Sequence, residues 1–349
     1  MNTMRAVLLT GHGGLDQLQL RDDVPIPIPR DNEVLIRIGA AAVNNTDINT
    51  RIGWYSKSVS TSTDSAVVAG ATDEGGWTGA LSFPRIQGTD ACGRIVAVGA
   101  SVPSSRVGER VLVDPVLRPA YGPAGYFASE CDGAFAEYTK VPTANAVRIE
   151  STLSDVELAS FPCAYSTAEN LLTRALLGGG ERVLVTGASG GVGSAAVQLA
   201  RRRGAHVVAL AAADKAATLT ELGADRVLGR DADLVAALGA DSVDVVIDVV
   251  GGPQFPALLA VLKSRGRYAV SGAIAGPIVT LDLRTLYLKD LALLGGTIQD
   301  SEVFGNLVSY IERGEIRPLV AATYPLAEIA AAQEAFLAKR HVGKIVLVP

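Results

Sequence analysis

The feature of this sequence that most restricts its fold is a glycine-rich turn between an apolar run and a helical stretch. Residues 183–193 read Val-Leu-Val-Thr-Gly-Ala-Ser-Gly-Gly-Val-Gly, and residues 194–203 have a helical pattern. The apolar residues at the start of the turn are typical of a strand buried on both faces. Gly190 and Gly193 let the backbone approach a pyrophosphate at the positive end of the following helix. The pattern predicts a dinucleotide-binding turn, although Ala188 stands at the first glycine of the usual motif.

The segments around the turn extend this prediction to a whole domain. Strand-like runs recur at Val207 to Ala211, Val245 to Val249 and Gly266 to Val270, separated by helical or loop segments of suitable length. Such alternation is typical of a doubly wound parallel sheet. The predicted fold class is therefore α/β, with a Rossmann domain.

Composition limits the possible partners and location. A chain of 349 residues is about two domains long, and its 48% hydrophobic and 19% charged residues are typical of a globular protein. No apolar stretch reaches the ~18 residues of a membrane-spanning helix, and Met1 to Thr10 lacks the layout of a signal peptide. We therefore expect a cytoplasmic protein without membrane contact. The net charge of −5 and the lack of a basic stripe argue against a nucleic-acid partner.

The cysteines indicate neither a disulfide framework nor a structural zinc lobe. Cys92, Cys131 and Cys163 are odd in number, widely spaced and without any Cys-x-x-Cys pair. Reduced thiols are expected.

The composition changes near residue 150. Before this point the sequence is rich in Pro and Gly with short strand-like pieces, whereas helical and strand patterns alternate from Ser154 to about Thr297. We predict a mainly β domain over residues 1–160, the Rossmann domain over 161–297, and a return of residues 298–349 to the first domain. The predicted elements outside the Rossmann domain are strands at Val34 to Val43, Gly93 to Val98, Arg110 to Val113, Phe135 to Val141 and Lys344 to Val348, and helices at Val303 to Arg313 and Leu326 to Lys339.

Residues 56–80 stand apart in composition. They are rich in Ser, Thr, Gly and Asp and, apart from Trp77, low in large apolar side chains. This composition is typical of a surface insertion, and a lid over a site is the functional alternative.

Several further motifs occur in an order that identifies a family. They are Val43 to Asp47, Gln87 to Gly93, Val107 to Val111, Gly133 to Tyr138 and Gly343-Lys344. With the glycine turn, they make the chain resemble the medium-chain dehydrogenase/reductase superfamily over essentially its full length, most closely the zinc-free quinone oxidoreductase (zeta-crystallin-like) branch. The resemblance implies a GroES-like N-terminal domain completed by the C-terminal tail, an inserted Rossmann domain, and a cleft in which nicotinamide meets substrate.

The zinc-ligand positions of the family can be compared with this sequence. Zinc-dependent relatives carry a cysteine where this chain has Asn44, a histidine where it has Thr89, and a cysteine where it has Cys163. Amide and hydroxyl oxygens are weak zinc ligands, so we expect no metal site despite Asp90 nearby. Cys163 is then interpreted as a packing residue. The histidines lie outside these motifs and are interpreted as surface or loop residues: His12, His206 and His341.

Without a metal, hydride has to go to a strongly electrophilic substrate. A quinone, or an alkene conjugated to a carbonyl, spreads the resulting negative charge onto oxygen, where hydrogen-bond donors stabilise it. The resemblance places Asn44 and Thr46 beneath the nicotinamide, and Tyr55 lies just after the helix expected near Asp47. These three are the candidate catalytic residues. Each has a structural alternative: turn capping for Asn44, helix capping for Thr46 and packing for Tyr55.

The cofactor preference depends on the end of the second Rossmann strand. An NAD site has a carboxylate about twenty residues after the glycine motif, where this chain has Ala211. Small residues there leave space for a 2′-phosphate, and Lys215 and Arg230 carry positive charge, with solvated surface charge as their alternative role. Asp214 would favour NAD if it turned inward, and we predict NADP (NADPH). The resemblance implies further cofactor contacts from Thr167, Ala188, Ser189, Gly190, Gly191, Val192, Gly193, Ser271, Gly272, Ala273, Thr297, Ile298 and Lys344.

Together these observations predict an NADPH-dependent, zinc-independent oxidoreductase that transfers hydride to a small-molecule quinone or α,β-unsaturated carbonyl. Two alternatives stay open: an alcohol dehydrogenase-like enzyme with residual metal binding, and a non-catalytic nucleotide-binding or structural protein. The segment Ile278 to Leu283 is strand-like, and in the family the corresponding edge strand pairs with its copy in a second subunit. A homodimer is therefore expected.

Overall fold

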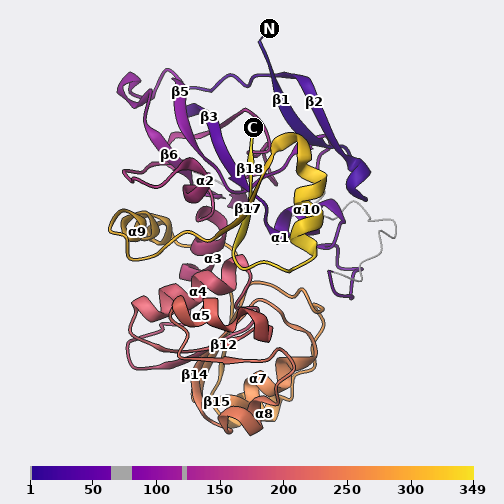
Figure 1. The fold of residues 1–349 in the computed structure, drawn as a ribbon, viewed down its shortest axis with the longest axis vertical. Coiled ribbons are helices and arrows are strands. Elements are labelled where there is room, and N and C mark those ends of the chain that lie inside the picture. The colour runs from indigo at the N-terminus through magenta and orange to yellow at the C-terminus, as the bar shows by residue number, and fades with distance from the viewer. Residues whose placement is uncertain (1, 64–80, 120–123) are drawn as a thin grey trace.

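The chain folds into two bodies that lie one above the other in Figure 1. The computed structural model describes residues 2–63, 81–119 and 124–349. Both ends of the chain lie in the upper body, and the red and orange segments from the middle of the chain form the lower one. No helix in the described ranges combines the length and the apolar character needed to cross a bilayer.

The lower body is built on a six-stranded parallel sheet. Along its central strand the side chains alternate between the faces: Val183 and Val185 belong to one hydrophobic core and Leu184 to another. The apolar run before the glycine turn is thus buried on both faces, and the predicted doubly wound α/β fold is confirmed. In spatial order the strands are β13 (Arg226–Leu228), β12 (His206–Leu210), β11 (Arg182–Val185), β14 (Val243–Asp248), β15 (Leu262–Val270) and β16 (Ala292–Gly295).

Helices cover this sheet. They are α3 (Pro162–Arg174), α4 (Gly191–Arg202), α5 (Ala216–Glu221), α6 (Leu234–Leu238), α7 (Phe255–Val261) and α8 (Leu283–Leu288). Helix α4 begins inside the glycine turn and contacts α3, which lies between the two bodies in Figure 1. On the opposite face, Phe255 and Leu258 of α7 pack in the same core as Leu184.

The upper body is mainly β, as predicted. Its largest sheet has the order β10-β6-β5-β3-β18-β17, and β9 also pairs with β3. The C-terminal strand β18 runs antiparallel to β3, with Val346 opposite Ala42, so the tail completes a sheet formed by the N-terminal segment. The bounds are β3 (Glu33–Ala42), β5 (Cys92–Val98), β6 (Arg110–Val113), β9 (Tyr138–Pro142), β10 (Ala146–Arg148), β17 (Val320–Pro325) and β18 (Lys344–Val348).

Smaller elements surround this sheet. A three-stranded sheet has the order β2 (Leu18–Pro25), β1 (Thr3–Leu9) and β4 (Arg85–Ile86), and β7 (Val116–Leu117) pairs with β8 (Gly125–Tyr126). The remaining helices are α1 (Asn45–Arg51), α2 (Asp155–Leu158), α9 (Ser301–Glu312) and α10 (Ile329–Leu337). Short 3-10 turns lie at η1 (Leu15–Gln17), η2 (Ser104–Arg106), η3 (Thr143–Asn145), η4 (Ala213–Lys215), η5 (Gly252–Gln254) and η6 (Leu326–Glu328).

One hydrophobic core joins the two bodies. It includes Ala42 and Leu112 of the upper sheet, Phe161 and Leu171 at or in α3, and Val185 of the parallel sheet. Because this packing is continuous, no gap in the core marks a boundary near residue 160. The domain bounds 1–160, 161–297 and 298–349 stay a prediction.

Most predicted elements lie within a few residues of the observed ones, and β6 and β18 have the predicted bounds. The strand predicted from Phe135 begins only at Tyr138, because the Phe135 N–H donates to the carbonyl of Gln87 instead. The helix predicted from Leu326 begins as a 3-10 turn and becomes α10 at Ile329.

The strand predicted for Ile278 to Leu283 is wrong within the single chain. Residues 277–282 form no strand, and Leu283 is the first residue of α8. The Asp282 carboxylate accepts a hydrogen bond of 2.9 Å from the N–H of Arg284 and so starts the helix. An extended segment also needs a neighbouring strand to form a ladder, and the described part of the chain provides none here.

Candidate active site

The start of α1 is tied into a buried polar cluster by Asn44. Its Nδ2 donates to Asp90 Oδ2 at 2.8 Å and to the carbonyl of Ala42 at 3.3 Å. Its Oδ1 accepts from Lys344 Nζ. Both ends of this amide are therefore engaged inside the protein, which favours the structural over the substrate-binding alternative for Asn44.

The centre of the cluster is an ion pair between Asp90 and Lys344. Lys344 Nζ lies 2.8 Å from Asp90 Oδ2, and the two side chains are 3% and 0% exposed. The other oxygen of Asp90 accepts from the N–H of Cys163 at 2.5 Å, at the start of α3. A buried ion pair is stable only when such additional hydrogen bonds satisfy its remaining atoms, and here they do.

A second carboxylate, Asp47, lies in the first turn of α1. It accepts hydrogen bonds from the N–H of Asn44 at 2.8 Å and of Gly88 at 3.2 Å. The pKa of Asp47 is raised to about 7, mainly by burial and also by the charge of Asp90. The two hydrogen bonds and the charge of Lys344 act in the opposite direction. The cluster thus combines one ammonium group with two carboxyl groups and has no surplus positive charge.

Thr46 and Tyr55 form a chain of hydroxyl groups beside this cluster. Tyr55 OH donates to Thr46 Oγ1 at 3.3 Å, which leaves the Thr46 proton for donation elsewhere. Burial raises the pKa of Tyr55, so its phenol stays protonated. Two of the three candidate catalytic residues thus form one donor chain.

Tyr126 is a site residue that the sequence analysis missed. Its hydroxyl lies 3.7 Å from Cys163 Sγ, and both side chains are buried. Burial, with the charge of Asp90, raises the pKa of Cys163 to about 12, so the residue is a thiol and not a thiolate. Tyr126 follows a Gly- and Pro-rich segment without periodicity, and no signal in the sequence connects it with Cys163.

The glycine turn has the shape of a phosphate cradle. Gly187 has a φ of +56°, and a Cβ on Gly193 would lie 2.2 Å from the carbonyl oxygen of Gly187. Ala188 is fully buried in the core, so the absence of a glycine there leaves the turn intact. The described geometry therefore fits a dinucleotide pyrophosphate at the N-terminus of α4. Around the turn Gly190 is exposed, and Ser189, Gly191 and Val192 are partly buried.

The C-terminal segment reaches both the turn and the cluster. The N–H of Gly343 donates to the carbonyl of Ser189 at 3.1 Å, and a Cβ on Gly191 would lie 2.9 Å from Lys344 Cδ. The side chain of Lys344 thus runs from the nucleotide turn to Asp90.

The other predicted cofactor residues lie on loops at the carboxyl ends of the parallel strands or on α3. Ser271, Gly272 and Ala273 follow β15 and are partly buried, and Thr297 and Ile298 follow β16 and are exposed. Thr167 lies one turn after Cys163 on α3, and its hydroxyl donates to the Cys163 carbonyl. Ala211 is buried at the end of β12. Arg230 is exposed, and Lys215 is turned toward the C-terminal segment.

The possible lid is only partly described. The N–H of Thr63 donates to the carbonyl of Ile274 at 3.0 Å, so the start of the segment contacts a loop of the lower body. Residues 64–80, with Trp77, lie outside the described residues, and the lid stays a prediction.

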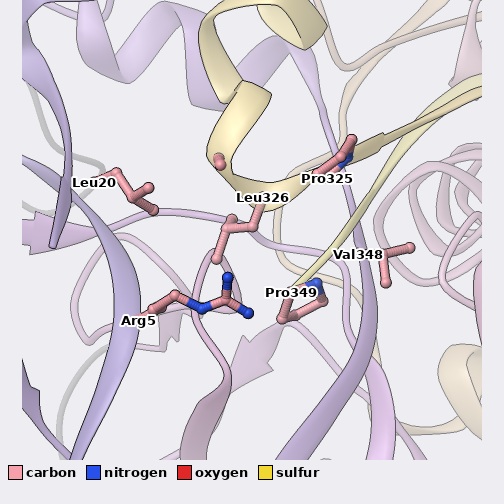
Figure 2. Close-up of a pocket in the computed structure, with 7 residues that line it drawn as sticks. Arg5, Leu20, Pro325, Leu326, Val348 and Pro349 are labelled. Carbon is pink, nitrogen blue, oxygen red and sulfur yellow. The ribbon is translucent and has the colours of Figure 1, made fainter. Parts of the chain in front are cut away.

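A shallow pocket elsewhere in the upper body has no connection with this cluster. In Figure 2, Arg5 of β1 and Leu20 of β2 lie on one side of it and the C-terminal residue Pro349 on another. Its volume is about 80 Å³. Its lining residues are Arg5, Leu20, Pro325, Leu326, Ala327, Val348 and Pro349. None belongs to the polar cluster or the nucleotide turn.

Fold and site together define an NAD(P)H-dependent oxidoreductase, and comparison with known proteins gives its family. Residues 30–151 match the alcohol dehydrogenase GroES-like domain, and residues 222–347 match the zinc-binding dehydrogenase family. The chain belongs to the medium-chain dehydrogenase/reductase superfamily, in its zinc-free quinone oxidoreductase-like branch. The predicted family and the GroES-like domain are thereby confirmed.

Two curated relatives extend over nearly the whole chain. An acryloyl-coenzyme A reductase of Metallosphaera sedula is 31% identical, with 99% of each chain covered. A human quinone oxidoreductase is 27% identical, with 99% of this chain and 98% of the relative covered.

Solved structures share the fold over the same length. That of a candidate alcohol dehydrogenase from Sinorhizobium meliloti 1021 has 47% identity and a TM-score of 0.90, covering 100% of this chain and 97% of the other. A mycobacterial protein complexed with NADPH has 28% identity and a TM-score of 0.80, covering 99% of this chain and 100% of the other.

Proposed function

We propose that this protein is an NADPH-dependent, zinc-independent reductase of α,β-unsaturated carbonyl compounds or quinones. The observation that supports this most is the Asn44–Asp90–Lys344 cluster. An internal ammonium group lies beside Asn44 and Asp90, next to positions where zinc-dependent relatives hold their metal. The relatives named for reduction of acryloyl-coenzyme A and of quinones support the same class of substrate.

The donor chemistry does not fit the zinc that the family description names. The Asn44 amide is engaged at both ends, and an amide and the hydroxyl of Thr89 are weak ligands for zinc, which prefers thiolate, imidazole or carboxylate. Among the described residues, no group of three or more His, Cys, Asp or Glu side chains could hold a metal ion. The alternative of an alcohol dehydrogenase-like enzyme with residual metal binding therefore has no support from these side chains.

The chain's own residues would stabilise the charge that hydride addition creates. A bound nicotinamide supplies the hydride. As negative charge develops on the substrate oxygen, the Thr46 hydroxyl would donate to it, and the Tyr55 phenol would strengthen that donor through its own hydrogen bond to Thr46 Oγ1. Lys344 and Asp90 hold the start of α1 in place and neutralise each other.

Removal of the Thr46 donor tests this mechanism. Thr46→Val is expected to lower kcat for enone or quinone reduction about 100-fold, because a single oxyanion donor contributes on that order. Tyr55→Phe is expected to have a smaller effect, and the double variant should match Thr46→Val alone, because Tyr55 acts through Thr46. Steady-state NADPH oxidation measures these rates, with Thr220→Val on α5 as the control. Independent, additive losses would contradict the donor chain.

The preference for NADPH rests on the end of β12. Ala211 is buried there, and no acid follows it directly. Two cationic side chains, Lys215 and Arg230, follow later in the chain. Burial lowers the pKa of Lys215, and the positive charge of Arg230 lowers it further. The structural relative complexed with NADPH supports the same cofactor. The non-catalytic alternative predicts that the protein binds nucleotide but turns over no substrate. Assays of NADPH oxidation with a panel of enones and quinones would distinguish this alternative from the proposed function.

A homodimer is part of the proposal. β16 ends the order of the parallel sheet, and an apolar patch, here called the edge patch, lies exposed on the neighbouring segments. Such a patch is typical of a protein interface. Its residues are exposed by 38% to 72% and comprise Ile278, Val279, Leu283, Tyr287, Leu288 and Leu293.

The edge patch can be tested by charge insertion. Leu288→Arg is expected to convert a dimer to a monomer at micromolar concentration, because a charge at an apolar contact loses its hydration without gaining a partner. Sedimentation velocity measures the change, and Ile28→Arg, at an 83% exposed residue outside the patch, is the control. A monomeric parent protein would contradict the dimer directly.

We also propose that the protein is cytoplasmic. All three cysteines are free in the structure, and Cys92 and Cys163 are buried. Free thiols are typical of a reducing compartment.

A further inference from the structure

The side chain of Lys215 is held by the C-terminal segment. Its Nζ donates to the carbonyls of Lys339 at 2.6 Å and His341 at 3.0 Å, and the residue is only 5% exposed. An ammonium group has three N–H donors, so two of them are used by this segment. Lys215 therefore binds protein backbone where the sequence suggested a direct contact with phosphate.

Two lysine side chains, Lys215 and Lys344, lie near His341. Burial lowers the pKa of its imidazole, and the charges of Lys215 and Lys344 lower it further. On the side of α10, the ring packs against Phe336 at a centroid distance of 6.0 Å. Like charges at close range repel, and an anion bound among them would relieve that repulsion.

Residues 339–343 lie along the expected binding site of a dinucleotide. Lys215 comes directly after β12, at the sheet edge where the adenosine ribose binds in Rossmann folds. Gly343, two residues after His341, donates to the carbonyl of Ser189 in the nucleotide turn. His341 thus lies on a segment that joins the ribose end of the site to its pyrophosphate end.

We propose that His341 binds the 2′-phosphate of NADPH directly, and that Lys215 is a positioning residue that holds the 339–343 segment against the nucleotide. This inference rests on the proposed preference for NADPH. An imidazole N–H donates to a phosphate oxygen, and protonation of the ring strengthens that hydrogen bond. The C-terminal tail, not only the Rossmann domain, then selects the cofactor.

Nucleotide fragments without nicotinamide test this role apart from catalysis. Calorimetry on the full-length protein would compare 2′-phospho-ADP-ribose with ADP-ribose. His341→Ala is expected to weaken binding of the phosphorylated fragment about tenfold, the loss of roughly one charge-assisted hydrogen bond, and to leave ADP-ribose unchanged. Lys215→Met is expected to weaken both fragments, because the whole segment loses its anchor. His206→Ala, at an exposed position at the start of β12, is the control.

The outcomes separate the two proposals. His341→Gln keeps an N–H donor and should retain most of the preference for the phosphorylated fragment, whereas a packing role would give no such rescue. An unchanged preference in His341→Ala, or a loss in Lys215→Met confined to the phosphorylated fragment, would overturn the inference. Equal affinity of the parent protein for both fragments would instead contradict the proposed NADPH preference.

Discussion

Lys344→Met is expected to reduce the free energy of unfolding by about 3–5 kcal/mol, the usual effect of removing one partner from a buried ion pair. Asp90 is fully buried, and the variant would leave its carboxylate without the ammonium group 2.8 Å away. Such a loss is a large fraction of the ~5–15 kcal/mol that stabilises a typical protein. Chemical denaturation followed by fluorescence measures it.

A double variant distinguishes charge pairing from simple packing. Asp90→Asn combined with Lys344→Met removes both charges, and an asparagine oxygen can still accept from the N–H of Cys163. Most of the lost stability should therefore return. If Lys344→Met alone costs less than about 1 kcal/mol, or if the double variant is the sum of the two single losses, the ion pair is not the centre of the cluster.

Gly193→Ala is expected to weaken NADPH binding about 100-fold or more. The added Cβ would lie 2.2 Å from the Gly187 carbonyl oxygen and 2.6 Å from Ala188 Cα, and backbone atoms cannot move aside as a flexible side chain can. The turn would have to open, and the loss of two hydrogen bonds to phosphate corresponds to roughly this factor. Fluorescence titration with NADPH measures the affinity.

Gly305→Ala is the matched control for this variant. Gly305 lies within α9, and a Cβ there would meet nothing within 4 Å. Alanine should leave NADPH binding unchanged and raise helix stability by about 1 kcal/mol or less. Wild-type affinity in Gly193→Ala would mean that the turn does not cradle the pyrophosphate.

Local patterns were sufficient to predict the parallel sheet. The apolar run before the glycine turn and the later strand-like runs depend on burial on both faces, a property that each segment carries by itself. Ile278 to Leu283 shows the limit of this approach. Its composition favours a strand, but a strand also needs a neighbour, and Asp282 starts a helix instead.

The polar contacts of the site could not be predicted in the same way. Asn44 and Lys344 were each candidates, but their contact joins residues 300 positions apart, and no periodicity encodes such a pairing. The hydrogen bonds of Lys215 could not be predicted, because its acceptors are backbone carbonyls, which every residue has. Cys163 and Tyr126 meet only through the fold.

The central proposal is that the protein reduces its substrate without a metal, with the cluster of Asn44, Asp90 and Lys344 in place of a zinc site. Activity after metal removal tests this proposal most directly. The purified protein would be dialysed exhaustively against a chelator, its zinc content determined by elemental analysis, and its NADPH oxidation measured with an enone and a quinone. We expect far less than one zinc per chain and an unchanged kcat/KM. Loss of activity on chelation, restored by stoichiometric zinc, would contradict it.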